Sequence, residues 1–283
     1  MSELWEALQR HAVQQPAAIA LQGATQAISY GALPERIEQL KSALLASGCR
    51  RFGLLADNSI DWALADLAAG CGEILLVPLP PFFSPQQLMH ALQNSGVQAI
   101  LTDQPQRVAA LLGEQAERLP LESAGSLSAL RLRHVAEPSI PPATAKITYT
   151  SGTTGQPKGV CLSRTAMETV AQSLADASQA VAQDRHLCLL PLSTLLENIG
   201  GIYVPLLAGA TTCILPLAEV GLTGAAALDV AKMAGALSRQ RASSAIMVPQ
   251  LLHALIAALA QGAPRPADLR FVAVGGAPVS PRS

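Results

Sequence analysis

Short apolar runs alternate with amphipathic stretches along most of the chain, and this pattern predicts strands that are each followed by a helix. In the stretch 27–49, for example, Ile37, Leu40, Leu44 and Leu45 recur at helical spacing after a short strand. The predicted strands lie at 17–22, 51–59, 73–81, 97–103, 186–192, 211–216, 243–249 and 269–276, and helices are predicted near 1–16, 33–47, 60–72, 84–96, 162–182, 196–210, 225–240 and 250–262.

This alternation predicts an α/β fold with mostly parallel sheets and helices on their faces. A chain of 283 residues exceeds one ordinary domain, so two packed units are expected. Residues 121–145 are rich in Ser, Ala and Pro and are predicted to be a connection. The boundaries are therefore expected to be 1–145 for a first α/β subdomain and 146–283 for a second.

Composition excludes several functions. The 19 basic and 20 acidic residues give a net charge of −1, which provides no electrostatic footprint for nucleic acid. The five cysteines are scattered, without a CxxC spacing, and the five histidines form no metal spacing. Disulfides and a zinc site are therefore not expected, and a reducing cytoplasm fits best.

One uncharged stretch is long enough to cross a bilayer. Residues 198–218 contain no charged side chain, and mean hydropathy over the whole chain is +0.32. The stretch also contains Pro205 and Pro216 with several glycines, and no basic cluster flanks it. A buried helix, a turn and a buried strand explain it better, so no stable membrane span is predicted.

The most unusual segment is "ITYTSGTTGQPKGV" at 147–160. Its glycines allow close backbone approach, its hydroxyls can donate hydrogen bonds, and Lys158 adds a cation next to the stiffening Pro157, which together suit a polyphosphate. The spacing is not that of a Walker A loop, because Pro157 stands where the second glycine is required. On chemistry alone a flexible surface turn remains an alternative.

The segment "YTSGTTGQPKGV" resembles the phosphate-loop signature of adenylate-forming enzymes, the superfamily of acyl-CoA synthetases, peptide-synthetase adenylation domains and luciferases. The stretches at 28–48, 53–81 and 269–278 are similar to further segments of that family. The resemblance implies the family's large N-terminal domain, built of two helix-flanked, mostly parallel sheets.

The resemblance also implies a reaction. Family members join a carboxylic acid to ATP, release pyrophosphate, and pass the acyl-adenylate to a thiol of coenzyme A or a carrier protein. ATP and Mg²⁺ are thus the implied cofactors, with Thr153 or Thr154 contacting the metal. Gly275, Gly276, Ala277 and Pro278 would border the adenine. The implied phosphate-binding residues are Thr150, Ser151, Gly152, Thr153, Thr154, Gly155 and Lys158, of which Lys158 is the catalytic candidate.

The segment "LPLSTLLEN" is similar to a Pro-Leu-x-His-x-x-Glu pattern of long-chain acyl-CoA synthetases, with Thr194 in place of the histidine. Amino-acid-activating relatives carry an aspartate near Leu192, so an α-amino acid is disfavoured and an apolar fatty or aryl acid is expected. These residues would also suit an ordinary apolar core. The substrate candidates are Thr194, Glu197, Asn198 and Ile202.

Several family motifs do not appear after "GGAP", including Tyr-Gly-x-Thr-Glu and the C-terminal catalytic lysine. The sequence therefore resembles a truncated N-terminal portion, expected to be inactive alone and to self-associate through apolar surface left bare. Two alternatives stay open: a non-catalytic nucleotide-binding or protein-interaction module, and a membrane-associated protein.

Overall fold

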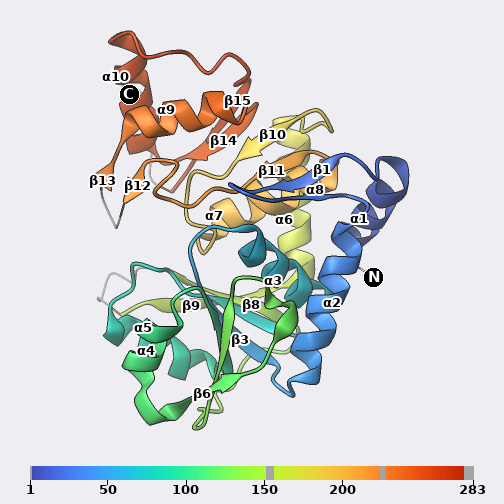
Figure 1. The fold of residues 1–283 in the computed structure, drawn as a ribbon, viewed down its shortest axis with the longest axis vertical. Coiled ribbons are helices and arrows are strands. Elements are labelled where there is room, and N and C mark those ends of the chain that lie inside the picture. The colour runs from blue at the N-terminus through green and yellow to red at the C-terminus, as the bar shows by residue number, and fades with distance from the viewer. Residues whose placement is uncertain (1, 151–155, 224–226, 277–283) are drawn as a thin grey trace.

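The computed structural model describes residues 2–150, 156–223 and 227–276. Its upper part in Figure 1 is a six-stranded sheet of order β15-β14-β10-β11-β1-β2, in which only β2 runs antiparallel to its neighbour. The strands of this sheet are β1 (Ile19–Gln22), β2 (Ala27–Ser29), β10 (Arg185–Leu187), β11 (Thr211–Cys213), β14 (Ser244–Met247) and β15 (Phe271–Val274).

The lower part is a seven-stranded sheet of order β6-β7-β5-β3-β4-β8-β9. Its four central strands are parallel, and antiparallel strands complete both edges. A separate small ribbon pairs β12 (Leu222–Thr223) with β13 (Ala227–Leu228). The seven strands are β3 (Arg51–Leu55), β4 (Leu75–Pro78), β5 (Ala99–Thr102), β6 (Ala116–Leu119), β7 (Ser128–Leu132), β8 (Thr144–Thr150) and β9 (Lys158–Ser163).

Helices lie outside both sheets and also between them (Figure 1). One apolar cluster joins the six-stranded sheet to α9 (Val230–Arg239) and α10 (Pro249–Ala260), and another joins the seven-stranded sheet to α4 (Pro85–Ser95) and α5 (Pro105–Leu112). The largest cluster fills the middle layer. That layer contains α1 (Glu3–Gln14), α2 (Leu33–Ala46), α3 (Ile60–Cys71), α6 (Arg164–Ser178) and α8 (Val204–Ala208).

Helix α3 shows how the sequence selects this middle layer. It begins at Ser59, whose hydroxyl accepts a hydrogen bond from the Trp62 amide, and then presents small or apolar residues apart from Asp61 and Asp66. All its residues from Ile60 to Ala69 are buried, as expected for a helix packed between other layers on all faces. Burial of Trp62 alone contributes about 2–3 kcal/mol of hydrophobic stabilisation.

The predicted fold class and the alternation of strands and helices are confirmed, but three details differ. The predicted connection at 121–145 contains β7, which completes an edge by antiparallel pairing. Residues 158–163 form strand β9, so the predicted helix at 162–182 begins only at Arg164. The predicted helix at 196–210 consists of α7 (Leu195–Glu197), a π-helical segment (Asn198–Tyr203) and α8.

The sheets are not divided at residue 145, where the sequence predicted a boundary between subdomains. Strands β1 and β2 pair into the sheet of the later strands, and β8 and β9 pair into the sheet of the earlier ones. The reason is that β8 extends the parallel sheet beside β4, which is buried along its whole length. Local sequence composition carries no signal for such long-range pairing.

The uncharged stretch at 198–218 contains the π-helical segment and α8, which pack against α6, and β11, a strand of the six-stranded sheet; most of its residues are buried. Within the described part of the chain, no helix has both the length and the apolar character needed to cross a membrane.

Stability should fall in alkaline solution. Burial raises the pKa of Cys71 to about 12 and that of Cys213 to about 11, from an ordinary value of 9.0. The unfolded chain therefore loses these protons first, and the stability present below pH 9 is lost as the pH rises through the folded values. For Cys213 alone we expect the free energy of unfolding to fall by about 2–3 kcal/mol over this pH range.

Three buried tyrosines also have raised pKa values, and they too make stability fall as the pH rises. Burial lowers the pKa of Lys146, which has the opposite effect on stability. Guanidinium titrations below pH 9 and near pH 11 measure the net effect. As a control, replacing the exposed Cys161 by serine should leave this fall in the free energy of unfolding unchanged. A free energy of unfolding that stays constant over this range would contradict the prediction.

Candidate nucleotide and acid site

The predicted phosphate loop forms the tip of a hairpin made by β8 and β9. Thr150 ends β8 and pairs directly with Lys158, the first residue of β9, and both side chains are exposed. Ser151, Gly152, Thr153, Thr154 and Gly155 lie outside the described residues. The strands thus place a hydroxyl and an ammonium group opposite each other where the loop begins and ends.

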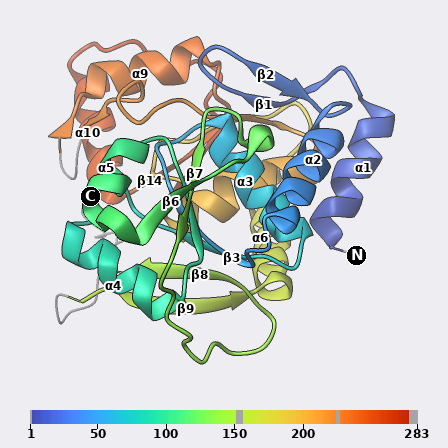
Figure 2. The same cartoon turned by 60° about the horizontal axis from the view of Figure 1, so that its bottom comes forward.

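Helix α4 holds this hairpin next to the loop, and Figure 2 shows it beside β8 and β9. The Tyr149 hydroxyl lies 3.0 Å from the Ala91 carbonyl oxygen and 3.0 Å from Asn94 Oδ1. On the other strand, His90 Nε2 lies 3.1 Å from the Pro157 carbonyl oxygen. Burial raises the pKa of Tyr149, so its hydroxyl keeps the proton that it donates. Both sides of the loop are therefore fixed to one helix.

Gly159 has a structural role in the same hairpin. A Cβ atom at this position would lie 2.9 Å from Ile147 Cγ2 and 3.2 Å from Tyr149 Cζ. The missing side chain therefore makes room for the Tyr149 ring, which in turn anchors the hairpin to α4. This packing accounts for Gly159 without a nucleotide.

The predicted adenine-binding residues begin immediately after β15. Gly275 donates a hydrogen bond to the Met247 carbonyl oxygen at 3.1 Å, and a Cβ on it would lie 2.9 Å from Leu196 Cδ2. Gly276 has a φ of +83°, which favours glycine. Ala277 and Pro278 lie outside the described residues. A contact between this strand end and adenine stays a prediction.

The carboxyl ends of the two sheets are joined by Asn58, which follows β3. Its side-chain amide donates to the Leu190 carbonyl oxygen at 2.9 Å, and its Oδ1 accepts from the Leu192 amide at 2.8 Å. Parallel strands share one carboxyl edge, so Thr150 lies at the same edge as Asn58, and Gly275 lies at the corresponding edge of the other sheet. Ligands of α/β proteins bind at such edges.

A buried ion pair lies on β8, four residues before the loop begins at Thr150. Lys146 of β8 places its Nζ 2.6 Å from Asp66 Oδ1 and 3.1 Å from the Tyr203 hydroxyl, and it also donates to Asn198 Oδ1. Asn198 donates in turn to Asp66 Oδ2 at 3.0 Å. Desolvation lowers the pKa of Lys146, and Asp66 opposes that shift. The network connects β8, α3 and the π-helical segment.

An apolar cavity of about 90 Å³ lies between α6 and the six-stranded sheet. Its walls include Leu196, Gly200 and Val204 on one side and Ala245, Ile246 and Ala273 on the other. Leu196, one of its walls, also abuts Gly275 at the strand end that is predicted to border adenine.

The four predicted substrate residues lie outside this cavity. Thr194 is exposed and its hydroxyl donates to the Pro191 carbonyl oxygen at 2.5 Å. Asn198 belongs to the Lys146 network, Glu197 contacts His186, and Ile202 packs in the middle layer. None of the four lines the cavity. Direct contact between these side chains and an acid stays a prediction, and their neighbours Leu196 and Gly200 are the residues of this segment that line the cavity.

Sequence reasoning missed the Lys146–Asp66 pair. A lysine in the run "TAKITYT", with apolar or β-branched neighbours on both sides, was a usable signal, because a strand buried on both faces must pair such a charge. The partner was not readable, since Asp66 lies eighty residues earlier on a helix.

A family model described as AMP-binding enzyme matches residues 8–283. The chain belongs to the AMP-binding enzyme family. A feruloyl-CoA synthase from Amycolatopsis sp is 27% identical over 278 residues, which are 95% of this chain and 53% of that protein. Surfactin synthase subunit 1 of Bacillus subtilis (strain 168) is 27% identical over 259 residues, which are 88% of this chain and only 7% of that protein.

Solved structures of the AMP-binding family share the fold. O-succinylbenzoate coenzyme A synthetase from Bacillus subtilis, in complex with AMP, superposes with a TM-score of 0.70 at 24% identity, covering 97% of this chain and 68% of that one. The N-terminal domain of FACL13 from Mycobacterium tuberculosis superposes with a TM-score of 0.74 at 22% identity, covering 100% of this chain and 72% of that one. The chain thus has the architecture of the family's N-terminal domain and spans about half the length of the feruloyl-CoA synthase.

Proposed function

We propose that this protein provides the nucleotide-binding and acid-binding part of an AMP-forming ligase that activates an apolar fatty or aryl acid. The observation that carries the proposal is the hairpin that sets Lys158 opposite Thr150 at the carboxyl edge of the seven-stranded sheet, joined through Asn58 to the edge that bears Gly275. Membership in the AMP-binding family supports the nucleotide.

The residues at the hairpin tip suit ATP and Mg²⁺. The Lys158 ammonium and the Thr150 hydroxyl can donate to phosphate oxygens, and both are exposed. Mg²⁺ takes oxygen ligands, so threonine hydroxyls of the loop, with Thr153 and Thr154 as candidates, would complete its shell together with phosphate oxygens and water. When bound, the ion would neutralise part of the triphosphate charge.

The chemistry follows from this placement. A carboxylate oxygen of the acid attacks the α-phosphorus of ATP, the bond to the bridging oxygen breaks, and pyrophosphate leaves. Negative charge on the leaving phosphates grows during this step, so a fixed ammonium group stabilises the transition state more than the ground state. Lys158, which follows Pro157 and its contact with α4, would take that role.

The apolar cavity supports the choice of acid. Its walls are almost entirely hydrocarbon, and the charged pair that it meets, Asp184 and Arg270, is already joined by a hydrogen bond of 2.8 Å. An acid whose carboxylate lies near Gly275 would extend its apolar part past Leu196 into this space. Relatives named as feruloyl-CoA synthase and O-succinylbenzoate coenzyme A synthetase make coenzyme A the proposed thiol, with a carrier-protein thiol as the alternative.

Pyrophosphate exchange into ATP tests the proposal. The longest natural form of the protein should catalyse exchange with at least one member of a panel of fatty and aryl acids, in a reaction that requires Mg²⁺. Nucleotide binding without exchange for any acid would instead support a non-catalytic nucleotide-binding module, and the absence of both would reject the proposed function.

Narrowing the cavity should change the choice of acid. Leucine at Ala273, on β15, would occupy part of the cavity, and we expect kcat/KM for long acids to fall by about tenfold or more relative to short acids. Ala257→Leu, at an exposed position of α10, is the matched control. Equal changes for long and short acids would place the acyl chain elsewhere.

A further inference from the structure

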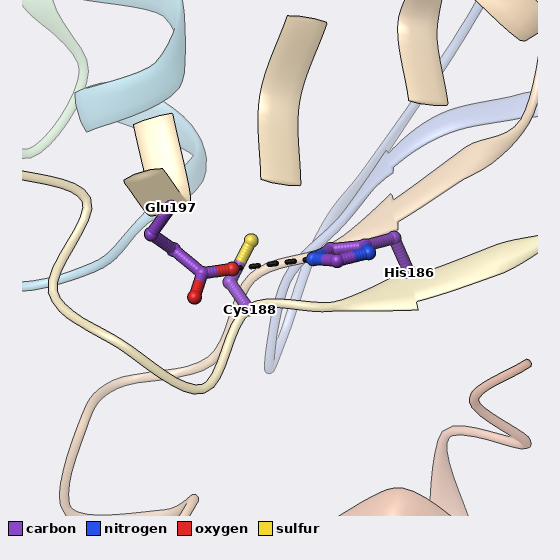
Figure 3. A group of neighbouring side chains, drawn as sticks. All are labelled: His186, Cys188 and Glu197. Carbon is purple, nitrogen blue, oxygen red and sulfur yellow. Dashed lines mark hydrogen bonds and ion pairs between the residues drawn. The ribbon is translucent and has the colours of Figure 1, made fainter. Parts of the chain in front are cut away.

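Three buried side chains of different chemistry meet beside the cavity (Figure 3). They are His186 of β10, Cys188 immediately after it, and Glu197 of α7, and their ligand-type atoms all lie within 4.8 Å of one another. The Nε2 atom of His186 is 3.2 Å from Glu197 Oε1. Imidazole, thiolate and carboxylate are the three protein ligands that zinc uses most.

The remaining polar atoms of this cluster are held by other groups. His186 Nδ1 lies 3.0 Å from Ser244 Oγ, and Glu197 Oε2 accepts from the Leu190 amide at 3.0 Å. These contacts leave His186 Nε2 and Glu197 Oε1 facing each other, with the Cys188 sulfur beside them, as Figure 3 shows. Metal-binding histidines and carboxylates are typically oriented in this way by outer hydrogen bonds.

Gly201 keeps the space beside the three atoms free. A Cβ at this position would lie 2.6 Å from Glu197 Oε1, 3.0 Å from Cys188 Sγ and 3.2 Å from His186 Nε2. Any other residue would therefore place an atom against all three groups at once. The glycine leaves them accessible to one another and to a small ion.

Charge balance is compatible with an ion here. Glu197 is fully buried, and within the described ranges His186 is its one basic partner at ion-pair distance. The nearby Lys146 is engaged by Asp66. One carboxylate, one thiolate, one neutral imidazole and one divalent cation sum to zero net charge, which is the least costly state for a buried site.

We propose that His186, Cys188 and Glu197 bind one divalent transition-metal ion, with zinc the expected occupant. On binding, the Cys188 thiol releases its proton to solvent and the sulfur–metal bond forms. His186 loses the proton on Nε2 and carries one on Nδ1 instead, which it donates to Ser244 Oγ, so the ring stays neutral. The hydrogen bond between His186 and Glu197 is then replaced by two metal bonds. His186 also lines the cavity, which offers room for a water as the fourth ligand. Thiolate and imidazole are poor ligands for Mg²⁺, so this site is distinct from the nucleotide metal.

Such an ion would connect β10 to α7, and through α7 to the π-helical segment that leads to the cavity wall. The proposal goes beyond the ligase function and does not depend on it. Its test therefore uses binding and spectroscopy of the purified chain and needs no substrate.

Cobalt reports this ligand set directly. After removal of metal with a chelator, Co²⁺ should bind one per chain and produce a sulfur-to-cobalt charge-transfer band with intense visible bands of a four-coordinate ion. Zn²⁺ should displace it and raise the thermal midpoint. Protein that binds no Co²⁺ with such a band would overturn the proposal.

A matched pair of cysteine variants assigns the sulfur. Cys188→Ser should abolish the charge-transfer band and weaken Co²⁺ binding by at least ~10²-fold, the upper end of the loss from an outer-shell partner alone. Cys161→Ser removes an exposed thiol and should change neither. Circular dichroism verifies that both variants are folded. A band that persists in Cys188→Ser and disappears in Cys161→Ser would show surface binding and reject the site.

Discussion

Lys146→Met should lower the free energy of unfolding by about 3–5 kcal/mol, because it leaves the buried carboxylate of Asp66 without its cation. Both side chains are almost completely buried and their charged atoms are 2.6 Å apart. Methionine retains the apolar stem, so the loss reports charge and hydrogen bonding more than packing. Against a total stability of about 5–15 kcal/mol for a typical domain, this is a large fraction.

Guanidinium unfolding measures the effect, and two further variants interpret it. Lys41→Met removes an ion pair with Glu38 in which the two side chains are 22% and 51% exposed, and it should cost less than about 1 kcal/mol. The double variant Lys146→Met/Asp66→Leu removes both buried charges and should recover much of the loss. A single variant as stable as Lys41→Met would show that the buried pair does not stabilise the fold.

Lys158→Ala should slow adenylation in the intact enzyme by ~10²-fold, which is the loss expected from one preorganised donor to developing charge. The side chain is exposed and forms no ion pair within the described ranges, so its removal should leave the thermal midpoint unchanged. Selective loss of rate without loss of stability separates a catalytic role from a structural one.

Single-turnover formation of acyl-adenylate is the appropriate measurement, since it isolates the step in which pyrophosphate leaves. Lys232→Ala, on the exposed side of α9, is the matched control and should keep the normal rate. If Lys158→Ala formed adenylate as fast as the control, Lys158 would have no part in the mechanism.

The sequence predicted those parts of the fold that depend on local pattern. The buried run of β4, the capped start of α3 and the amphipathic face of α2 each follow from residues within one element. The phosphate loop was recognisable for the same reason, because its chemistry lies in consecutive residues. The hairpin around it was not, since β9 is defined by its pairing with β8 rather than by its own pattern.

The parts that the sequence did not predict all depend on residues distant in the chain. Lys146 is paired with Asp66, and Asn58 is bonded to Leu190 and Leu192, across separations that no spacing rule covers. The cluster of His186, Cys188 and Glu197 was missed although its members are close in sequence, because a strand, a loop and a helix start intervene. Histidine spacing alone therefore gave no metal signal.

The wide turn at Asn198–Tyr203 lets one short segment serve two sheets. Each residue of an ordinary helix advances the side-chain direction by about 100°, so the extra residue in a π-type turn shifts the phase of everything beyond it. Asn198 and Tyr203 can thereby both reach Lys146 of β8, while Glu197, just before the turn, contacts β10. Shortening this turn by one residue would put the two sets of partners out of register, and this link between the two halves of the molecule would be lost.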